Sequence, residues 1–177
     1  MNNLSFTPFP KISTANYYLR RLSINDDKEI FILRSDERVL KYLGKPKAKS
    51  INEAKEFIDK INLGIEKNEW IMWVIESKKN NIFIGTICLW NLSADKTKAD
   101  IGFEILPDHF GKGIMQEVIP EVLNYGFNKM KLDIIEGEVD PKNIKSIKLM
   151  EKYGFEYNRK LESTVVYYLK NQNRTIK

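Results

Sequence analysis

Residues 101–115 read Ile-Gly-Phe-Glu-Ile-Leu-Pro-Asp-His-Phe-Gly-Lys-Gly-Ile-Met. The apolar run stops at Pro107, a turn with two glycines follows, and a helical pattern of apolar residues begins at Ile114. Such a turn presents backbone N–H groups at a helix N-terminus, where the helix dipole favours negative charge. Glycine lets the main chain approach a ligand closely, and Lys112 adds a point charge. The stretch therefore predicts a strand, a phosphate-binding turn and a helix.

The composition is that of a water-soluble globular protein. The chain has 177 residues, with 42% hydrophobic and 30% charged side chains, and we expect residues 1–177 to form one domain. The net charge of +5 suits an anionic small ligand at least as well as nucleic acid, which is an unlikely partner. Cys88 is the only cysteine, and residues 1–10 do not resemble a signal peptide. No segment approaches the roughly 20 apolar residues that span a bilayer, so we expect a cytoplasmic protein that does not bind membranes.

Local patterns predict the elements around the opening stretch. Ser50-Ile-Asn-Glu53 has the form of a capping box, and apolar residues follow at helical spacing up to Ile65. Further helices are expected at 26–33, 39–43, 113–128 and 143–153, the last closed by Gly154. Strands are expected at 17–22, 70–76, 83–90, 99–106, 132–139, 155–161 and 165–169. Residues 1–15 are expected to be a lead-in, partly ordered at best, and Pro120 is expected to kink its helix.

The order of these elements predicts a mixed α/β protein of the α+β class, with a central, mostly antiparallel sheet flanked by helices. The strands at 100–106 and 132–139 should run parallel, because the helix between them supplies the crossover that a parallel pair needs. A dinucleotide-binding fold is the alternative, with Asp133 as its ribose carboxylate. It fits less well, because Gln116 stands where the glycine fingerprint needs its third glycine. A P-loop is excluded, since no Gly-Lys-Ser/Thr occurs.

A second segment points to a family. Residues 140–155 read Asp-Pro-Lys-Asn-Ile-Lys-Ser-Ile-Lys-Leu-Met-Glu-Lys-Tyr-Gly-Phe and follow the pattern N-x-x-S-x-x-L-x-E-K-x-G-F. Together with I-G-F…P-x-x-x-G-K-G at 101–113, the segment resembles the GNAT acetyltransferase superfamily, in its RimJ/RimL-like branch. The Leu-Arg-Arg-Leu strand at 19–22 and the Phe-Ile-Gly-Thr-Ile strand at 83–87 also fit, so the resemblance covers about residues 17–170.

The resemblance implies that acetyl-CoA is the cosubstrate. In the family two neighbouring strands splay apart, and the pantetheine arm lies between them; here these are the strands at 100–106 and 132–139. The pyrophosphate loop maps onto residues 108–113, with Asp108 in place of the usual Gln or Arg, and we expect Asp108 to point away from phosphate. The implied cofactor-binding residues are Ile105, Leu106, His109, Phe110, Gly111, Lys112, Gly113, Ile114, Met115 and Asn143.

The resemblance also implies a mechanism of direct transfer. Glu104 is the candidate general base that accepts a proton from the acceptor amine, and the alternative is a carboxylate that only forms a salt bridge. Ser146 is the candidate donor of a proton to the leaving thiolate, because Met150 replaces the tyrosine that many members use. The backbone N–H of Ile105 would hold the oxyanion. Asn143 could instead be only a helix cap.

The expected function is therefore transfer of an acetyl group from acetyl-CoA to a primary amine, such as the N-terminal α-amine of a peptide or ribosomal protein. The alternatives are a non-catalytic acyl-CoA-binding module and, less favoured, an acetyltransferase for a small molecule such as an antibiotic or polyamine. The walls of the acceptor site are expected at about residues 24–66 and 161–170. The three tryptophans are expected to pack in the sheet. We expect no metal, and a monomer or homodimer.

Overall fold

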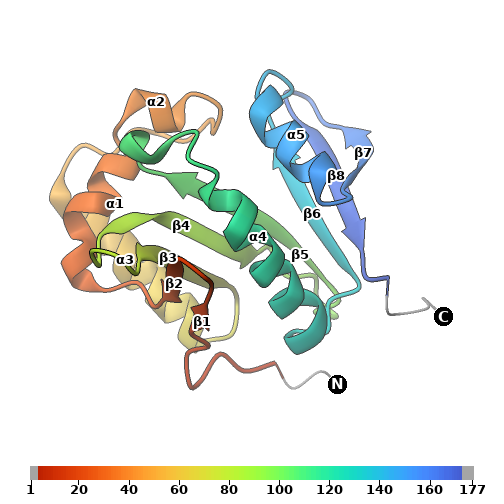
Figure 1. The fold of residues 1–177 in the computed structure, drawn as a ribbon, viewed down its shortest axis with the longest axis horizontal. Helices are drawn as coiled ribbons and strands as arrows, with labels where there is room; N and C mark the ends of the chain where they lie inside the picture. The colour runs from red at the N-terminus through yellow and green to blue at the C-terminus, as the bar shows by residue number, and fades with distance from the viewer. Residues whose placement is uncertain (1–3, 173–177) are drawn as a thin grey trace.

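The computed structural model describes residues 4–172, and its centre is one eight-stranded sheet (Figure 1). The order across the sheet is β1-β2-β3-β4-β5-β6-β8-β7. The strands are β1 Ile12–Ser13, β2 Tyr17–Arg20, β3 Ile71–Ser77, β4 Phe83–Trp90, β5 Lys98–Ile105, β6 Ile134–Val139, β7 Glu156–Lys160 and β8 Val165–Lys170. Every neighbouring pair is antiparallel except β5 and β6, which are parallel. The predicted fold class and the predicted parallel pair are both confirmed.

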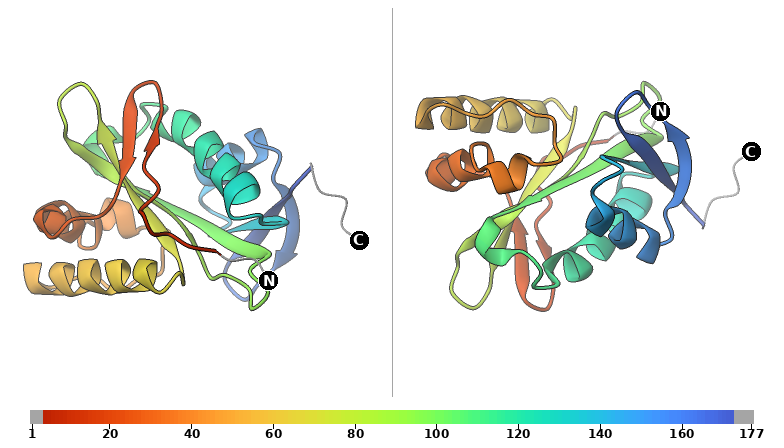
Figure 2. Two further views of the ribbon diagram at one scale, coloured as in Figure 1. Left: turned by 90° about the horizontal axis from the view of Figure 1, so that it is seen from below. Right: turned by 90° about the horizontal axis from the view of Figure 1, so that it is seen from above.

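Helices cover both faces of the sheet (Figure 2). One face is covered by α1 Asp27–Leu33 and α3 Ile51–Glu66, with the short α2 Glu37–Leu40 between them in sequence. The other face is covered by α4 Ile114–Asn124, which links β5 to β6, and by α5 Ile144–Lys152. The amphipathic pattern explains this arrangement, because the apolar residues of α3 and α4 recur at helical spacing and are the buried ones.

The predicted helix ends are reproduced by local hydrogen bonds. The Ser50 hydroxyl accepts from the Glu53 N–H at 3.3 Å, as a capping box requires, while the Glu53 carboxylate accepts from the N–H of Lys49. At the end of α5, Gly154 has a φ of +83°, which is a left-handed conformation suited to glycine. The N–H groups of Gly154 and Phe155 then close the last turn of α5, donating to Glu151 and Met150.

The N-terminal segment is more than a loosely attached lead-in. Phe6 is 1% exposed, and its backbone N–H donates to Asn68 at 2.7 Å. The buried indole of Trp73 donates to the carbonyl of Pro10 at 2.7 Å, and β1 pairs with β2 at the edge of the sheet. The expectation for residues 1–15 is therefore wrong for residues 4–15, because a large aromatic side chain there is buried in the core. Residues 1–3 lie outside the described residues.

Helix α4 contains Pro120 and continues past it to Asn124. A wider π-helical turn, Tyr125–Lys129, follows directly, and the Met130 N–H donates to the Tyr125 carbonyl. The proline therefore does not end the helix, and the kink expected at this residue stays a prediction.

Candidate functional site

The two parallel strands separate soon after they meet. Their register pairs Lys98 with Ile134, Ala99 with Ile135 and Asp100 with Glu136, and it ends there although both strands continue. Figure 1 shows β5 and β6 diverging toward the end at which α4 and α5 begin. The splayed pair that the family resemblance implied is therefore present, and it leaves the β6-facing edge of β5 unpaired from residue 101 onward.

The backbone of β5 turns one free donor toward this unpaired edge. The Leu106 N–H donates to the Ile84 carbonyl of β4 at 2.9 Å, and the Leu106 carbonyl accepts from His109. Successive N–H groups of a strand point to opposite sides, so the N–H of Ile105 faces away from β4, toward the splay. Of these two residues from the expected cofactor set, Ile105 keeps a backbone donor for a ligand and Leu106 does not.

The glycine turn precedes α4 and has the geometry of an anion site. Gly111 and Gly113 both have a φ of +73°, and a Cβ at either position would meet no atom within 4 Å. The glycines are therefore required by backbone conformation, while the space beside them is open. The backbone N–H groups of residues 111–115 have no hydrogen-bond partner among residues 4–172. Five consecutive donors at the N-terminus of an eleven-residue helix can bind an anion such as a pyrophosphate.

The side chains of the turn differ in what they offer. Lys112 is exposed, and Phe110 is 48% exposed. The pKa of His109 is lowered by desolvation and by the charge of Lys112, so its imidazole is neutral near pH 7. Asp108 is exposed and its charge acts on Arg38 of α2, consistent with a carboxylate that points away from the turn. Beyond the turn, Ile114 and Met115 bury their side chains in the core and offer a ligand only their backbone.

Glu104 lies within the splayed part of β5, one residue before the end of the strand, with a side chain that is 13% exposed. Its carboxylate accepts a hydrogen bond from the Lys45 ammonium at 2.6 Å, and Lys45 comes from the loop between α2 and α3. Burial, together with the nearby charge of Glu104, raises the pKa of the Cys88 thiol to about 12. Cys88 is therefore a neutral thiol at physiological pH and no nucleophile.

Sequence reasoning did not anticipate two residues around Glu104. Lys45 lies within the stretch expected to form an acceptor wall, but its contact with Glu104 joins residues 59 positions apart. Gly85 of β4 lies opposite Ile105, and a Cβ there would lie 2.2 Å from the Glu104 carbonyl oxygen. Only glycine lets the two backbones approach this closely. The Phe-Ile-Gly-Thr-Ile strand carried that signal, because an isolated glycine inside a strand indicates close backbone approach.

Helix α5 begins with two of the expected site residues. Asn143 is its N-cap, and its side-chain oxygen accepts from the Ser146 N–H at 3.3 Å. The Asn143 amide NH2 group and the Ser146 hydroxyl have no partner among the described residues, so both remain available to a ligand. Met150 is buried, and its sulfur would lie 2.5 Å from a Cβ at Gly137 of β6. Met150 therefore packs helix against strand, where the family often has a tyrosine.

The expectation of sheet packing holds for Trp73, whereas Trp70 lies just before β3 and packs against α3. Trp73 is fully buried, and Trp70 donates its indole N–H to the Ile61 carbonyl of α3. Trp90 is 47% exposed at the end of β4. It lies beside Gly102, on the same face of the sheet as Glu104.

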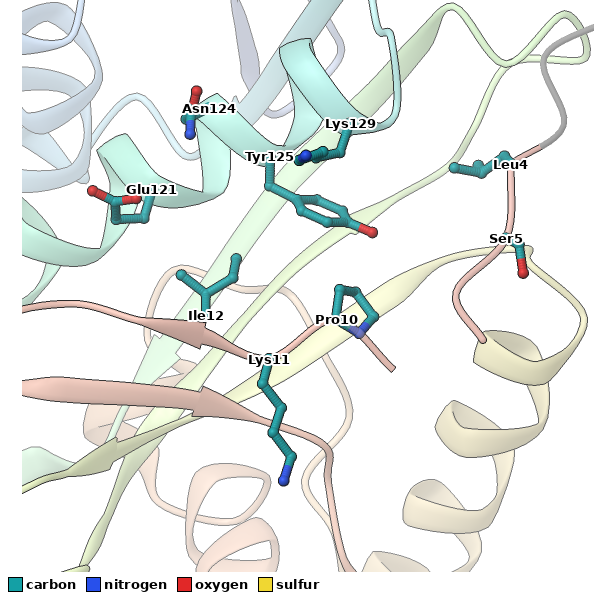
Figure 3. A pocket seen from close by; sticks show the side chains of 9 residues that line it. All are labelled: Leu4, Ser5, Pro10, Lys11, Ile12, Glu121, Asn124, Tyr125 and Lys129. Atoms are coloured by element: carbon teal, nitrogen blue, oxygen red, sulfur yellow. The ribbon is translucent and has the colours of Figure 1, made fainter. Parts of the chain in front are cut away.

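A separate cavity of about 530 Å³ lies between the N-terminal segment and the end of α4 (Figure 3). It is lined by Leu4, Ser5, Pro10, Lys11, Ile12, Glu121, Asn124, Tyr125 and Lys129. None of the candidate site residues lines this cavity, and its ionisable groups carry both signs of charge.

Comparison with known proteins identifies the family. A family model described as an acetyltransferase (GNAT) domain matches residues 16–156. The chain belongs to the GNAT family of acetyltransferases. It is 33% identical over 148 residues to the uncharacterized N-acetyltransferase YoaA of Bacillus subtilis, covering 84% of each chain. The predicted membership in the RimJ/RimL-like branch is confirmed, and the chain is an N-acetyltransferase.

Two solved structures illustrate the range of the fold. Spermidine N-acetyltransferase from Vibrio cholerae, in complex with CoA and spermine, is 25% identical, with a TM-score of 0.77 over 86% of this chain and 94% of that one. Ribosomal-protein-S5-alanine acetyltransferase from Vibrio fischeri is 18% identical, with a TM-score of 0.78 over 93% and 98%. The second likeness shows the fold alone.

The fold also decides against the dinucleotide-binding alternative. That fold has a doubly wound parallel sheet, whereas this sheet contains one parallel pair and is otherwise antiparallel. GNAT enzymes use an acyl-CoA donor. Among residues 4–172, no helix is both long enough and apolar enough to cross a bilayer.

Proposed function

We propose that this GNAT enzyme transfers the acetyl group of acetyl-CoA to a primary amine, and that Glu104 takes the proton that the amine must lose. The observation that carries the proposal is the unpaired end of β5. Three kinds of group lie within the twelve residues 104–115: the Glu104 carboxylate, the Ile105 N–H and the free N–H groups of residues 111–115. Donor-binding and proton-accepting groups therefore lie on adjoining segments.

The donor side uses mainly the backbone. Bound acetyl-CoA would supply a thioester that an amine can attack. The N–H groups of residues 111–115 and the Lys112 ammonium are suited to its pyrophosphate, and the Asn143 amide to its pantetheine arm. The Ile105 N–H, directed into the splay, is suited to the negative charge that develops on the thioester oxygen during attack.

The acceptor side is defined by Glu104. An ammonium group already lies 2.6 Å from this carboxylate, because Lys45 occupies the position. A general base must lie about 2.6–3.2 Å from the group whose proton it removes. We infer that the ammonium group of the acceptor takes the place of Lys45 and is deprotonated there. An α-amine, with a pKa near 7.7–8.0, needs less help than a lysine near 10.4, which favours a peptide N-terminus as acceptor.

The leaving thiolate needs a proton, and the described residues offer few donors. Met150 carries no ionisable group, and Cys88 is on β4 with its sulfur directed to the Gly102 carbonyl. The Ser146 hydroxyl is half-buried and has no other partner among the described residues, so it is the candidate donor, directly or through water.

The experiment is a panel of acceptors incubated with acetyl-CoA, with release of the CoA thiol as the readout. The panel contains peptides with free N-termini, the same peptides with blocked N-termini, and polyamines such as spermidine. Release with free but not with blocked peptides supports the proposal. Release with polyamines alone identifies a small-molecule acetyltransferase. Binding of CoA without release for any amine supports a non-catalytic acyl-CoA-binding module instead.

A further inference from the structure

Pro120 changes the hydrogen bonding of the first turns of α4. In an α-helix the N–H of each residue donates to the carbonyl four residues earlier, so residue 120 would donate to Gln116. Proline has no N–H. The Gln116 carbonyl therefore lacks the donor that the helix would ordinarily supply, at a point three residues beyond Gly113.

Another helix supplies a donor. The Tyr153 hydroxyl, at the C-cap of α5, donates to the Gln116 carbonyl at 2.6 Å. Burial raises the pKa of Tyr153, so this hydroxyl keeps its proton well above neutral pH. A second bond joins the same elements, because the Lys152 ammonium donates to the Gln116 side-chain oxygen at 2.8 Å. Gln116 thus accepts two hydrogen bonds that link α5 to α4, and these two bonds are called the α4–α5 tie below.

This tie adjoins the glycine turn. The Gln116 N–H donates to the Gly113 carbonyl at 3.0 Å and closes the first turn of α4. The carbonyl that Tyr153 contacts therefore lies only three residues beyond Gly113, the N-cap of α4. At the other end of α5 are Asn143 and Ser146. The tie joins the helix that follows the phosphate turn to the helix that carries the other candidate cofactor contacts.

We propose that Tyr153 is a positioning residue for acetyl-CoA: it bonds to the carbonyl that Pro120 leaves open and so holds α5 at a fixed place beside the phosphate turn. This proposal rests on the proposed function, because it requires that the pyrophosphate binds at residues 111–115. Tyr153 acts through Gln116 and does not itself need to touch the cofactor.

The test compares CoA binding in Tyr153→Phe with the unchanged protein by calorimetry. Phenylalanine keeps the ring and removes only the hydroxyl, so the Kd for CoA should rise about three- to tenfold, the effect of one ordinary hydrogen bond. The KM for acetyl-CoA should rise with it, while kcat and the KM of the acceptor stay unchanged. Tyr157→Phe is the control, because Tyr157 is an exposed tyrosine on β7 whose ring packs edge-to-face against Tyr167 of β8.

Two further arms separate positioning from stability. S-acetylpantetheine lacks the pyrophosphate and so cannot contact α5 and the phosphate turn at once, and its use as donor should fall less than that of acetyl-CoA in Tyr153→Phe. Pro120→Ala restores a backbone N–H that competes for the Gln116 carbonyl, so Tyr153→Phe should cost less CoA affinity in that background. An equal loss in both backgrounds, or an equal loss for S-acetylpantetheine, overturns the proposal. So does unchanged CoA affinity in Tyr153→Phe when the parent protein binds CoA. A parent protein that does not bind CoA overturns the proposed function itself.

Discussion

Replacing Glu104 with glutamine separates the proton-accepting role proposed for this carboxylate from its role in an ion pair. Glutamine keeps the shape of the side chain, and its amide oxygen can still accept a hydrogen bond from Lys45, but it cannot take a proton from an amine. Lys45 is 48% exposed, so loss of the pair should cost about 0.2–1 kcal/mol of stability. The Tm should therefore fall by no more than about 4 °C in a protein of this size.

The catalytic effect should be far larger than the effect on stability. Loss of a general base lowers turnover roughly 10²–10⁴-fold. This corresponds to about 2.7–5.4 kcal/mol of activation free energy, at 1.36 kcal/mol for each factor of ten. The loss should shrink as the pH rises, because a growing fraction of the acceptor amine is then neutral without help. The affinity for CoA should not change, since the expected phosphate contacts are the backbone N–H groups of residues 111–115 and the Lys112 ammonium.

Thiol release from acetyl-CoA, followed from about pH 6 to 9 with a confirmed acceptor, measures this effect. Glu37→Gln is the matched control, because Glu37 also pairs with a lysine of the loop after α2, Lys47, but lies far from β5 in sequence. Ser146→Ala should be milder than Glu104→Gln, since water can replace a hydroxyl. Near-normal turnover of Glu104→Gln over the whole pH range would refute the reasoning and leave Glu104 a structural residue.

Three further substitutions test other parts of the site. Gly113→Asp should raise the Kd for CoA more than tenfold in calorimetry, about 1.4 kcal/mol or more, because it adds strain and a negative charge where phosphate is expected. Gly44→Asp, also at a positive φ of 58° with open space around it, should leave CoA affinity unchanged; equal effects would mean that strain alone is responsible. Gly85→Ala should lower the free energy of unfolding by about 1–3 kcal/mol in a denaturant titration, since the new Cβ overlaps the Glu104 carbonyl. An unchanged free energy of unfolding would contradict the close approach of the β4 and β5 backbones at this residue. Cys88→Ala should retain turnover. The Cys88 thiol should react slowly with alkylating agents below about pH 10, because its pKa of about 12 keeps it protonated. Fast labelling at neutral pH would contradict this.

Much of the fold could be predicted because it depends on neighbours in sequence. The cap at Ser50, the left-handed Gly154 and the helical spacing of apolar residues in α3 and α4 are local features, and each predicted element appears close to its expected place. The parallel pair follows from the same information. A strand, a helix of sufficient length and another strand leave the chain little choice but a crossover.

Other features depend on residues that are distant in sequence and so have no local signature. Phe6 belongs to the segment expected to be a partly ordered lead-in, and only the folded chain shows that its side chain is buried in the core. In the sequence Lys45 is one lysine of a loop, and only the folded chain brings its ammonium group into contact with the Glu104 carboxylate. Gln116 looks like a departure from a glycine fingerprint, yet in the structure its carbonyl accepts the Tyr153 hydroxyl.

Local pattern was thus sufficient for the order of the elements, the helix ends, the phosphate turn and, through the two family motifs, the class of reaction. The tertiary structure alone decided where β5 and β6 part, which backbone donors remain free, which cation lies at Glu104 and how α5 is held to α4. The physical reason is that periodicity and capping act over a few residues, so the sequence displays them directly. Strand separation and ion pairing instead follow from how the packed layers meet, and packing joins groups across the whole chain.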